Sequence, residues 1–469
     1  MKMNRINAKI VSCFLTLFLV LSCTNDRNSS DIPTGPTPST ISELVFVNTR
    51  LSLLTEALDR TGLLQTLDIE GPFTLFAPPN EVFEQFLREN SYTDLSEVPV
   101  DLLRNILLNH VIDGEFVITD LFSLSIKTLA TQNNSDLNLS MLIDDSSGGF
   151  IINGEVSIDI NNFDVRASNG IIHIVDGVIN LPTVATLVNA NPNLTALAGV
   201  LPSELINTLS SESNFTLLAP NDNAFANTSE IPSGDTLANL LSNHVINDNL
   251  SSTDFVAMGP TYSKSMGTYL DTNSLSLYHR IDDNDDLVFN GISKVQQADI
   301  VATNGIIHIV DEVVAIPTVV TFATADPDFS TLVSALTTLT PETSFVDILS
   351  RTETNNGDMI NPPFTVFAPT NMAFDAITVP EEGVLTEVLL HHVASEVNIT
   401  SGTSTQNGSS TVSTLEGDNL IITLPGTDSN IADVTDGSGN TDLGIIKVDI
   451  QAGNGIIHVL NKVAIPNLD

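Results

Sequence analysis

The sequence predicts an α/β protein built from three tandem copies of one domain, and two recurring motifs carry this prediction. The first motif, Phe-Thr-x-x-Ala-Pro, begins at Phe73, Phe215 and Phe364. The second motif, Asn-Gly-Ile-Ile-His, follows in each copy and begins at Asn169, Asn304 and Asn454. Repeats this long indicate tandem globular domains, because a solenoid repeats after only about 20–45 residues. The expected domains are residues 42–183, 184–318 and 319–469.

Composition limits the classes of function that the chain can serve. Its 469 residues include 57 Asp+Glu against 16 Lys+Arg, which gives a formal net charge of −41. Proteins that bind nucleic-acid phosphates, or that bind anionic membranes through basic helices, need clustered Lys and Arg instead. The 42% of hydrophobic residues is enough to bury a core in each domain, so the chain is not an acidic disordered tail.

Residues 1–22 have the pattern of a secretion signal. Lys2, Arg5 and Lys9 precede the apolar run 10–21. That run is too short to cross a hydrocarbon core of ~30 Å. We therefore expect a cleaved leader here and not a membrane-spanning helix.

The leader ends in Val20-Leu21-Ser22-Cys23, which resembles the lipobox of bacterial lipoproteins. The resemblance implies cleavage before Cys23 and a lipid on its sulfur. An ordinary cleaved signal with an incidental cysteine is the alternative. The segment after the cysteine is rich in Pro, Ser and Thr, so residues 23–41 are expected to form a lipidated, flexible tether. The expected location is the exterior of a bacterium, at the outer membrane or cell surface.

The first motif predicts a short strand, a turn and then a helix. Phe73, Leu75 and Ala77 alternate with the residues between them, as in a strand. Two residues after the proline of the motif a residue able to cap a helix recurs. These expected caps are Asn80, Asp222 and Asn371.

The second motif predicts a turn at its glycine and a strand after it. Ile171 and His173 point to one face of that strand, whereas Ile172 and Ile174 point to the other. Both faces are mostly apolar, so the strand is expected to be buried on both sides.

Together the two motifs resemble the hallmarks of the fasciclin-like (beta-Ig-H3/fasciclin) domain family. The resemblance covers nearly the whole chain after the tether. It implies three compact domains, each a β-sheet wedge with several packed helices. It also implies extracellular adhesion, through binding to cell-surface receptors, matrix proteins or surface polysaccharide.

Six of the eight histidines recur as one pair in each copy. The first of each pair ends an amphipathic helix, and the second lies in the second motif. We expect packed, hydrogen-bonded core residues; the alternative is a metal site, for which no clustered spacing is present. The six structural-motif residues are His110, His173, His244, His308, His392 and His458.

No motif of a catalytic site is present. The sequence lacks a Gly-x-Ser-x-Gly elbow, a phosphate-binding glycine loop and a His-Glu-x-x-His pair. We therefore expect a binding protein and not an enzyme, with no metal or cofactor.

In animal members of the family, an Asp-Ile pair just before the second motif is implicated in integrin contact. The resemblance makes the matching pairs candidate partner-binding residues; the alternative is that each aspartate caps a local turn. These pairs are Asp164 with Val165, Asp299 with Ile300, and Asp449 with Ile450. The tyrosine that precedes the first histidine in the family is absent here, where Asn109, Asn243 or His391 stands.

Two further features bear on ligands. The acidic run 282–286 invites a calcium hypothesis, but Leu287 and Ser293 stand where an EF-hand needs Gly and Glu, so a solvated acidic turn is expected. Polysaccharide binding is the rival function, and three of the four tyrosines lie between residues 262 and 278. Exposure of those rings would favour it and burial would oppose it.

The sequence thus predicts a surface adhesion protein that binds a cell-surface protein, matrix protein or polysaccharide. It touches the membrane through its lipid anchor alone and binds no nucleic acid. Three linked copies of one site could gain avidity if they engage together.

Overall fold

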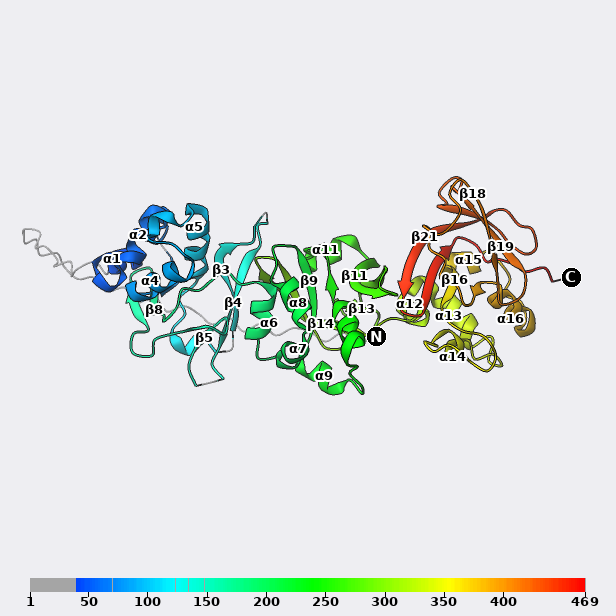
Figure 1. Ribbon diagram of the computed structural model, residues 1–469, viewed down its shortest axis with the longest axis horizontal. Helices are drawn as coiled ribbons and strands as arrows, with labels where there is room; N and C mark the ends of the chain where they lie inside the picture. The colour runs from blue at the N-terminus through cyan, green and yellow to red at the C-terminus, as the bar shows by residue number, and fades with distance from the viewer. Residues whose placement is uncertain (1–38, 70, 123, 134, 147, 469) are drawn as a thin grey trace, which may run out of the picture. The chain divides into compact units, whose positions relative to one another are not determined.

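The computed structural model describes residues 39–468 apart from residues 70, 123, 134 and 147. Within them the chain forms three sheets, one for each copy of the two motifs, with helices packed on each (Figure 1). The predicted α/β class is confirmed. We call the elements from α1 to β8 the first domain, those from α6 to β15 the second and those from α12 to β22 the third. The leader, Cys23 and the tether as far as residue 38 lie outside the described residues.

The first domain contains an eight-stranded sheet in the order β6-β5-β4-β3-β2-β1-β8-β7. Its helices are α1 (Ile41–Val47), η1 (Thr49–Leu51), α2 (Ser52–Arg60), α3 (Leu63–Thr66), α4 (Asn80–Glu89), η2 (Leu95–Glu97), α5 (Val100–Asn109) and η3 (Ile118–Asp120). Its strands are β1 (Phe73–Ala77), β2 (Val111–Asp113), β3 (Leu124–Thr131), β4 (Asn138–Asp144), β5 (Ile151–Ile152), β6 (Val156–Ser157), β7 (Val165–Ala167) and β8 (Gly170–Ile174).

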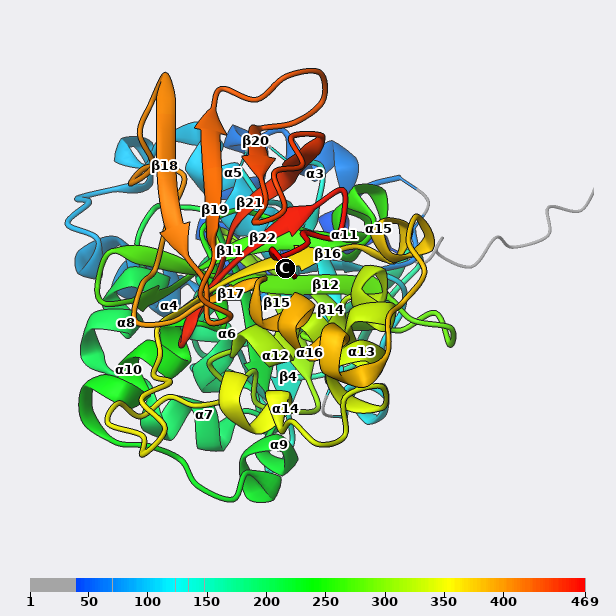
Figure 2. The same ribbon diagram turned by 90° about the vertical axis from the view of Figure 1, so that its right-hand side faces the viewer.

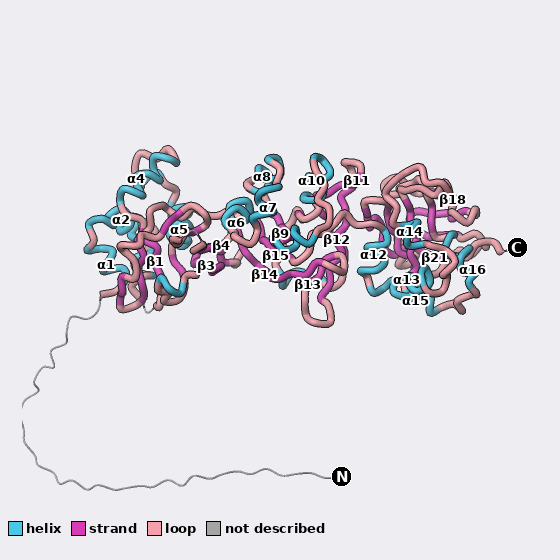
Figure 3. The backbone as a smooth tube through the Cα atoms, turned by 90° about the horizontal axis from the view of Figure 1, so that it is seen from below, coloured by secondary structure: helices cyan, strands magenta, loops and turns pink. Residues whose placement is uncertain are grey.

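The second domain closes its sheet into a barrel, in the order β10-β11-β12-β13-β14-β15-β9. Figure 3 separates its helices from its strands by colour. The helices are α6 (Val184–Ala190), α7 (Thr195–Val200), α8 (Ser203–Leu209), α9 (Asp222–Asn227), α10 (Gly234–Ser242) and α11 (Ser252–Met258). The strands are β9 (Phe215–Pro220), β10 (Val245–Ile246), β11 (Thr261–Tyr269), β12 (Asn273–Ile281), β13 (Leu287–Phe289), β14 (Ser293–Ala302) and β15 (Gly305–Val310).

The third domain has a seven-stranded sheet in the order β17-β16-β22-β21-β20-β19-β18, with β18 at its edge (Figure 2). The helices are α12 (Val319–Ala325), η4 (Pro327–Phe329), α13 (Ser330–Thr337), α14 (Phe345–Leu349), α15 (Asn371–Asp375) and α16 (Glu382–Leu390). The strands are β16 (Phe364–Pro369), β17 (Val393–Ala394), β18 (Gly408–Ser413), β19 (Asn419–Leu424), β20 (Ala432–Thr435), β21 (Leu443–Ala452) and β22 (Gly455–Leu460).

In every domain the two motif strands pair in parallel, as β1 with β8, β9 with β15 and β16 with β22. The motif glycine lies opposite the first residue of the partner strand. A Cβ at Gly170 would lie 1.9 Å from the carbonyl oxygen of Phe73, and the corresponding distances are 2.3 Å at Gly305 and 2.2 Å at Gly455. No side chain fits there, because non-bonded carbon and oxygen atoms need more than 3 Å, roughly the sum of their radii.

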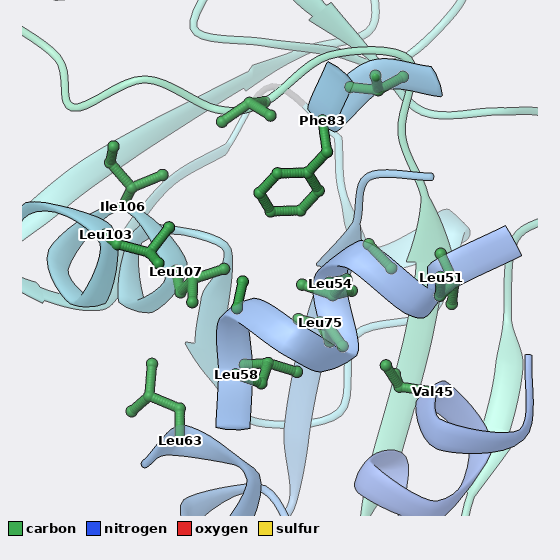
Figure 4. Close-up of a cluster of buried hydrophobic side chains, with 14 of the residues drawn as sticks. Val45, Leu51, Leu54, Leu58, Leu63, Leu75, Phe83, Leu103, Ile106 and Leu107 are labelled. Carbon is green, nitrogen blue, oxygen red and sulfur yellow. The ribbon is translucent and has the colours of Figure 1, made fainter. Parts of the chain in front are cut away.

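The second-motif strand is buried on both faces, as its sequence predicts. Every residue of β8, β15 and β22 is buried. In the first domain, Ile172 packs with the helical cluster that contains Leu54 and Phe83 (Figure 4), and Val175 packs with a second cluster around Phe76. The central strand pair therefore anchors two cores at once.

The motif asparagine ties this strand to the first helix of its own domain. The side-chain oxygen of Asn169 accepts a hydrogen bond of 2.8 Å from the backbone N–H of Ile41. Its amide group donates to two carbonyls that follow α3, at 2.8 and 2.9 Å. Asn304 and Asn454 make the same three bonds in their domains. All three side chains are buried, so each replaces water by protein partners.

The residues predicted to cap the helices after the first motif do not do so. Asn80, Asp222 and Asn371 are each the first residue of their helix. The side chain of Asn80 instead accepts from the backbone N–H of Leu53 in α2 at 2.9 Å, and the other two accept in the same way from α7 and α13. They therefore stabilise the N-terminus of an earlier helix, which carries unpaired N–H groups.

Consecutive domains are joined without a free linker. The carbonyl oxygen of Pro182 accepts a hydrogen bond of 2.8 Å from Thr303 of the second domain, and the next residue, Thr183, caps α6. Pro317 and Gly453 repeat this bond between the second and third domains at 2.7 Å.

Candidate functional site

The three aspartates of the candidate partner-binding pairs share one local geometry. Asp164, Asp299 and Asp449 have φ angles of 53°, 60° and 59°, in the left-handed region that aspartate tolerates. Each carboxylate accepts a hydrogen bond of 2.8 Å from one backbone N–H of its own domain. The donors are Ile118, Ser252 and Ser401. The carboxylates thus hold a local turn together.

The aliphatic partner of each aspartate differs in exposure between domains. Val165 is 42% exposed, whereas Ile300 and Ile450 are each 2% exposed. In the second and third domains, a side chain of the preceding domain packs in the same core cluster as this residue: Leu142 with Ile300, and Tyr278 with Ile450.

The cover is a β-hairpin of the preceding domain, which we call the docking hairpin: β3–β4 in the first domain and β11–β12 in the second. It packs on the strand that carries the aspartate, which we call the receiving strand: β14 in the second domain and β21 in the third. Lys127 donates to the main-chain oxygen of Asp299 at 2.5 Å and to Ser140 Oγ at 3.1 Å. Ser140 Oγ in turn accepts from the N–H of Val301 at 2.9 Å.

The contact between the second and third domains repeats this pattern atom for atom. Lys264 donates to the main-chain oxygen of Asp449 at 2.6 Å and to Ser276 Oγ at 3.0 Å. Ser276 Oγ accepts from the N–H of Gln451 at 3.0 Å. Desolvation at the interfaces lowers the pKa of both lysines below the usual lysine value. Both carry two oxygen partners, which a neutral amine would bind more weakly.

Each docking hairpin also places one large side chain in the core of the next domain. Leu142 joins the helical core of the second domain, and Tyr278 joins that of the third. Tyr262 packs beside Tyr278 and donates to a carboxylate oxygen of Asp326 at 2.8 Å. Burial, followed by the charge of Asp326, raises the pKa of the Tyr262 hydroxyl. Two of the clustered tyrosines are therefore used between domains and do not form an open stacking platform.

Among the described residues, the Asp164–Val165 pair is thus the copy that no neighbouring domain covers. It lies at β7, the edge strand of the first sheet. The next residue, Arg166, is exposed and pairs with Glu115 at 2.7 Å. This edge, with Val165 and Arg166, is the candidate binding surface of the chain.

The first histidine of each copy is a buried connector. Nδ1 of His110 donates to the carbonyl of Ile106, and Nε2 accepts from the N–H of Ile179. His244 and His392 make the equivalent bonds to Leu240 and Val314, and to Val388 and Ala464. Burial lowers the pKa of all three to about 4, so the rings are neutral at pH 7.

The second histidine of each copy holds the aspartate turn. Nε2 of His173 bonds the carbonyl of Phe116 at 2.9 Å, and Nδ1 accepts from the N–H of Asp164 at 3.3 Å. His308 and His458 repeat both bonds. Burial lowers the pKa of these three rings as well. The two histidines of a copy thus hold different segments and do not converge on one ligand.

The acidic run 282–286 has a partner from the chain itself. Lys294 lies 2.9 Å from a carboxylate oxygen of Asp282 and 3.0 Å from one of Asp286. These hydrogen bonds raise the pKa of Lys294 to about 12 and lower that of Asp282. Across residues 39–468, outside the four undescribed positions, no three His, Cys, Asp or Glu side chains are grouped as metal ligands. No helix in that same part is long and apolar enough to cross a bilayer.

Sequence reasoning missed two sets of residues that position the candidate surface. The docking lysines and serines carried a signal, since a lysine recurs at the same place in two copies of a chain with 16 Lys+Arg. The motif asparagines were visible as invariant letters of the repeat. Their partners lie about a hundred residues earlier, where no local pattern points to them.

Comparison with known proteins finds a family that the chain matches three times. The model of the fasciclin domain family matches residues 49–182, 192–317 and 327–466. The chain is 27% identical over 352 residues to transforming growth factor-beta-induced protein ig-h3 of Sus scrofa, covering 72% of this chain and 47% of that protein. It is 28% identical over 265 residues to human periostin, covering 54% of this chain and 30% of periostin. The chain therefore spans about half the length of the first of these relatives and less than a third of periostin.

A solved structure of a FAS1 domain pair from the insect cell adhesion molecule Fasciclin I is also similar, with 20% sequence identity and a TM-score of 0.37. The match covers 57% of this chain and 93% of that one. The family model matches most of the chain, in three copies that coincide with the three observed sheets. The chain belongs to the fasciclin domain family.

Proposed function

We propose that the chain is a cell-surface adhesion protein that binds a cell-surface or matrix protein through its fasciclin domains, without catalysis. The observation that carries this proposal is the uncovered Asp164–Val165 edge of the first domain. In the other two domains the same edge binds protein, and there it takes a β-hairpin. The edge is therefore a surface already shaped for protein contact.

This proposal restricts which copy acts. Ile300 and Ile450 are buried in core clusters that include Leu142 and Tyr278 of the docking hairpins, so their pairs are closed to an outside partner while the domains stay in contact. The three copies are therefore unequal, and the avidity of three equal sites should not arise. Asp164 contributes through its backbone and its turn, because its carboxylate is bonded to Ile118. Val165 supplies the exposed apolar contact.

We further propose that a lipid on Cys23 holds the domains at the bacterial outer membrane or cell surface. The sequence pattern around Cys23 and the Pro-rich segment after it support this. The relatives named above belong to a family of adhesion proteins, which fits an extracellular location.

Polysaccharide binding is the weaker alternative. A sugar platform needs exposed aromatic rings, and Tyr278 is 1% exposed. Tyr262 is half-buried and bonded to Asp326. Hydrogen-bonded capture of a glycan elsewhere on the chain stays open to test on a glycan array.

Adhesion is tested by coating a surface with the full chain and counting bound cells that lack it. Val165→Asp should abolish binding, because it places a charge in the apolar contact. Val256→Asp is the matched control, since Val256 is 59% exposed on α11 of the second domain. Equal binding by both variants and by the unaltered chain would remove Asp164–Val165 from the proposal.

The anchor is tested separately by fractionating cells that express Cys23→Ala. The variant should leave the membrane fraction. If it stays there, the lipid is not what attaches the chain.

A further inference from the structure

Each contact between domains uses one docking hairpin and one receiving strand. Three domains joined in series therefore leave one of each unused. The unused hairpin is β18–β19 of the third domain, and the unused receiving strand is β7 of the first. Figure 1 labels β18 and β19 in the last domain of the array.

The hairpin β18–β19 corresponds to the two docking hairpins residue by residue. Lys127 pairs across the ladder with Ser140, and Ser413 pairs with Asn419 in the same way. The hydroxyl of the next threonine, Thr414, bonds the carbonyl of the residue before Asn419, as in the first domain.

The side chains on this hairpin differ from those used inside the array. Ser413 replaces the docking lysine, and Asn419 replaces the docking serine. Ile421 takes the place of the inserted Leu142 and Tyr278, and it is 39% exposed. The third domain thus presents an apolar side chain with no docking lysine beside it.

The charges at the two free ends are complementary. Inside the array, Val301 of the receiving strand packs against Ala130 and Leu139 of the docking hairpin. On the free strand β7, the position of Val301 is taken by Arg166, whose side chain is 66% exposed.

On the free hairpin, the position of Leu139 is taken by Asp418, with Glu416 two residues before it. The apolar contact between the first and second domains becomes an arginine at one end and two carboxylates at the other. Each of these groups also has a partner in its own domain: Glu115 for Arg166, the N–H of Asn467 for Asp418, and His391 for Glu416. Opposite charges at matched positions favour association and set its register.

We propose that the β18–β19 hairpin of one chain docks on strand β7 of a second copy of the chain. Ile421 then inserts beside α1 as Leu142 does beside α6, and Arg166 meets Asp418 and Glu416. The proposal rests on the proposed function, because it names a partner for the same Asp164–Val165 edge. The contact is heterologous, so each chain keeps one free end and association can continue.

The residue differences at the free ends also disfavour contacts between a free end and an internal face. A docking hairpin with Lys127 or Lys264 would bring a second cation to Arg166. The free hairpin would bury the charged carboxylate of Asp418 against the apolar side chain of Val301. Such contacts cost free energy, so the free ends select each other over the internal faces.

The test is sedimentation velocity of the purified full-length chain in a non-ionic detergent, over a wide range of concentration. The mean mass should rise with concentration and fall when salt screens the charges. Arg166→Glu blocks the receiving strand, and Ile421→Asp blocks the hairpin. Ile292→Asp is the control, since Ile292 is 57% exposed in the second domain. Circular dichroism verifies that each variant is folded.

Each blocked variant alone should stay monomeric, whereas the control should associate like the unaltered chain. An equal mixture of the two blocked variants should give a two-fold increase in mass and no more, because each supplies one intact end. A chain that is monomeric throughout, or a mixture that does not dimerise, overturns the proposal. If the unaltered chain does not self-associate but still binds cells that lack the chain, this inference alone is overturned. If the chain self-associates but does not bind such cells, the proposed function is overturned.

Discussion

The Nε2 atom of His110 accepts a hydrogen bond of 2.9 Å from the backbone N–H of Ile179, 69 residues later in the chain. The other ring nitrogen bonds the carbonyl of Ile106 at 2.8 Å. A protonated ring has no acceptor, so His110 can hold α5 and the closing segment together only while neutral. The same holds for His244 and His392.

These rings make stability depend on pH. Their pKa is about 4 in the folded chain, below the ordinary value of 6.5. Between these values the unfolded chain binds protons that the folded chain excludes, so stability falls as pH decreases from 6.5 towards 4. The loss approaches roughly 3 kcal/mol per histidine. Urea unfolding between pH 7 and pH 5 measures it, and a flat profile would contradict the neutral rings. His110→Gln should reduce the dependence of the unfolding free energy on pH and should also lower stability at pH 7.

Gly170→Ala should prevent the first domain from folding, or destabilise it by more than ~3 kcal/mol. The new methyl group would overlap the carbonyl of Phe73, in the strand pair that anchors both cores. Gly199→Ala in α7 is the control, because nothing lies within 4 Å of its Cβ position. Thermal unfolding should show the control at or slightly above the original stability. Similar losses in both variants would argue against the close approach.

Asn304→Ala should destabilise the second domain by roughly 2–4 kcal/mol, because it leaves a helix N–H and two carbonyls buried without partners. Asn227→Ala removes an exposed asparagine of the same domain and should change stability by less than about 0.5 kcal/mol. Urea denaturation compares the two. Equal effects would mean that the buried amide is not a tie between helix and strand.

Lys127→Met should loosen the contact between the first and second domains without unfolding either. It removes a charge-assisted hydrogen bond worth about 1.5–3 kcal/mol. Amide hydrogen exchange at Val301, whose N–H is bonded to Ser140, should become faster. Lys294→Met is the control, since Lys294 pairs with carboxylates of its own domain. Unchanged exchange at Val301 would show that the lysine does not hold the interface.

Much of each domain could be predicted from local patterns. The buried strand after Gly170 could be predicted because apolar residues occupy both of its faces. The helix that His110 terminates could be predicted from the helical spacing of its apolar residues. Asn80 was wrongly predicted to cap its own helix. The same side-chain amide can instead accept a hydrogen bond from another helix, and only the fold shows that α2 lies beside Asn80.

The site was less predictable, for a physical reason. Asp164, Asp299 and Asp449 look equivalent in sequence and have equivalent turns. What separates them is the domain that precedes each one. The difference between Arg166 and Val301 can be interpreted only after the fold shows which hairpin packs on Val301. Barrel closure in the second domain likewise needs β10 to pair with β11 and β14 to bridge β13 and β15, whereas the first domain has the two short strands β6 and β7 in place of β14.

The bond from Thr303 to the carbonyl of Pro182 has a mechanical consequence. With Thr183 already capping α6, the junction holds no slack that could lengthen under tension. A pulling force applied between the first and third domains therefore loads the docking contacts together with the junctions. The chain should transmit small forces stiffly and yield first at Lys127 and Lys264. Rupture of those contacts would uncover the receiving strands at Ile300 and Ile450, so tension would change which copies of this edge face the solvent.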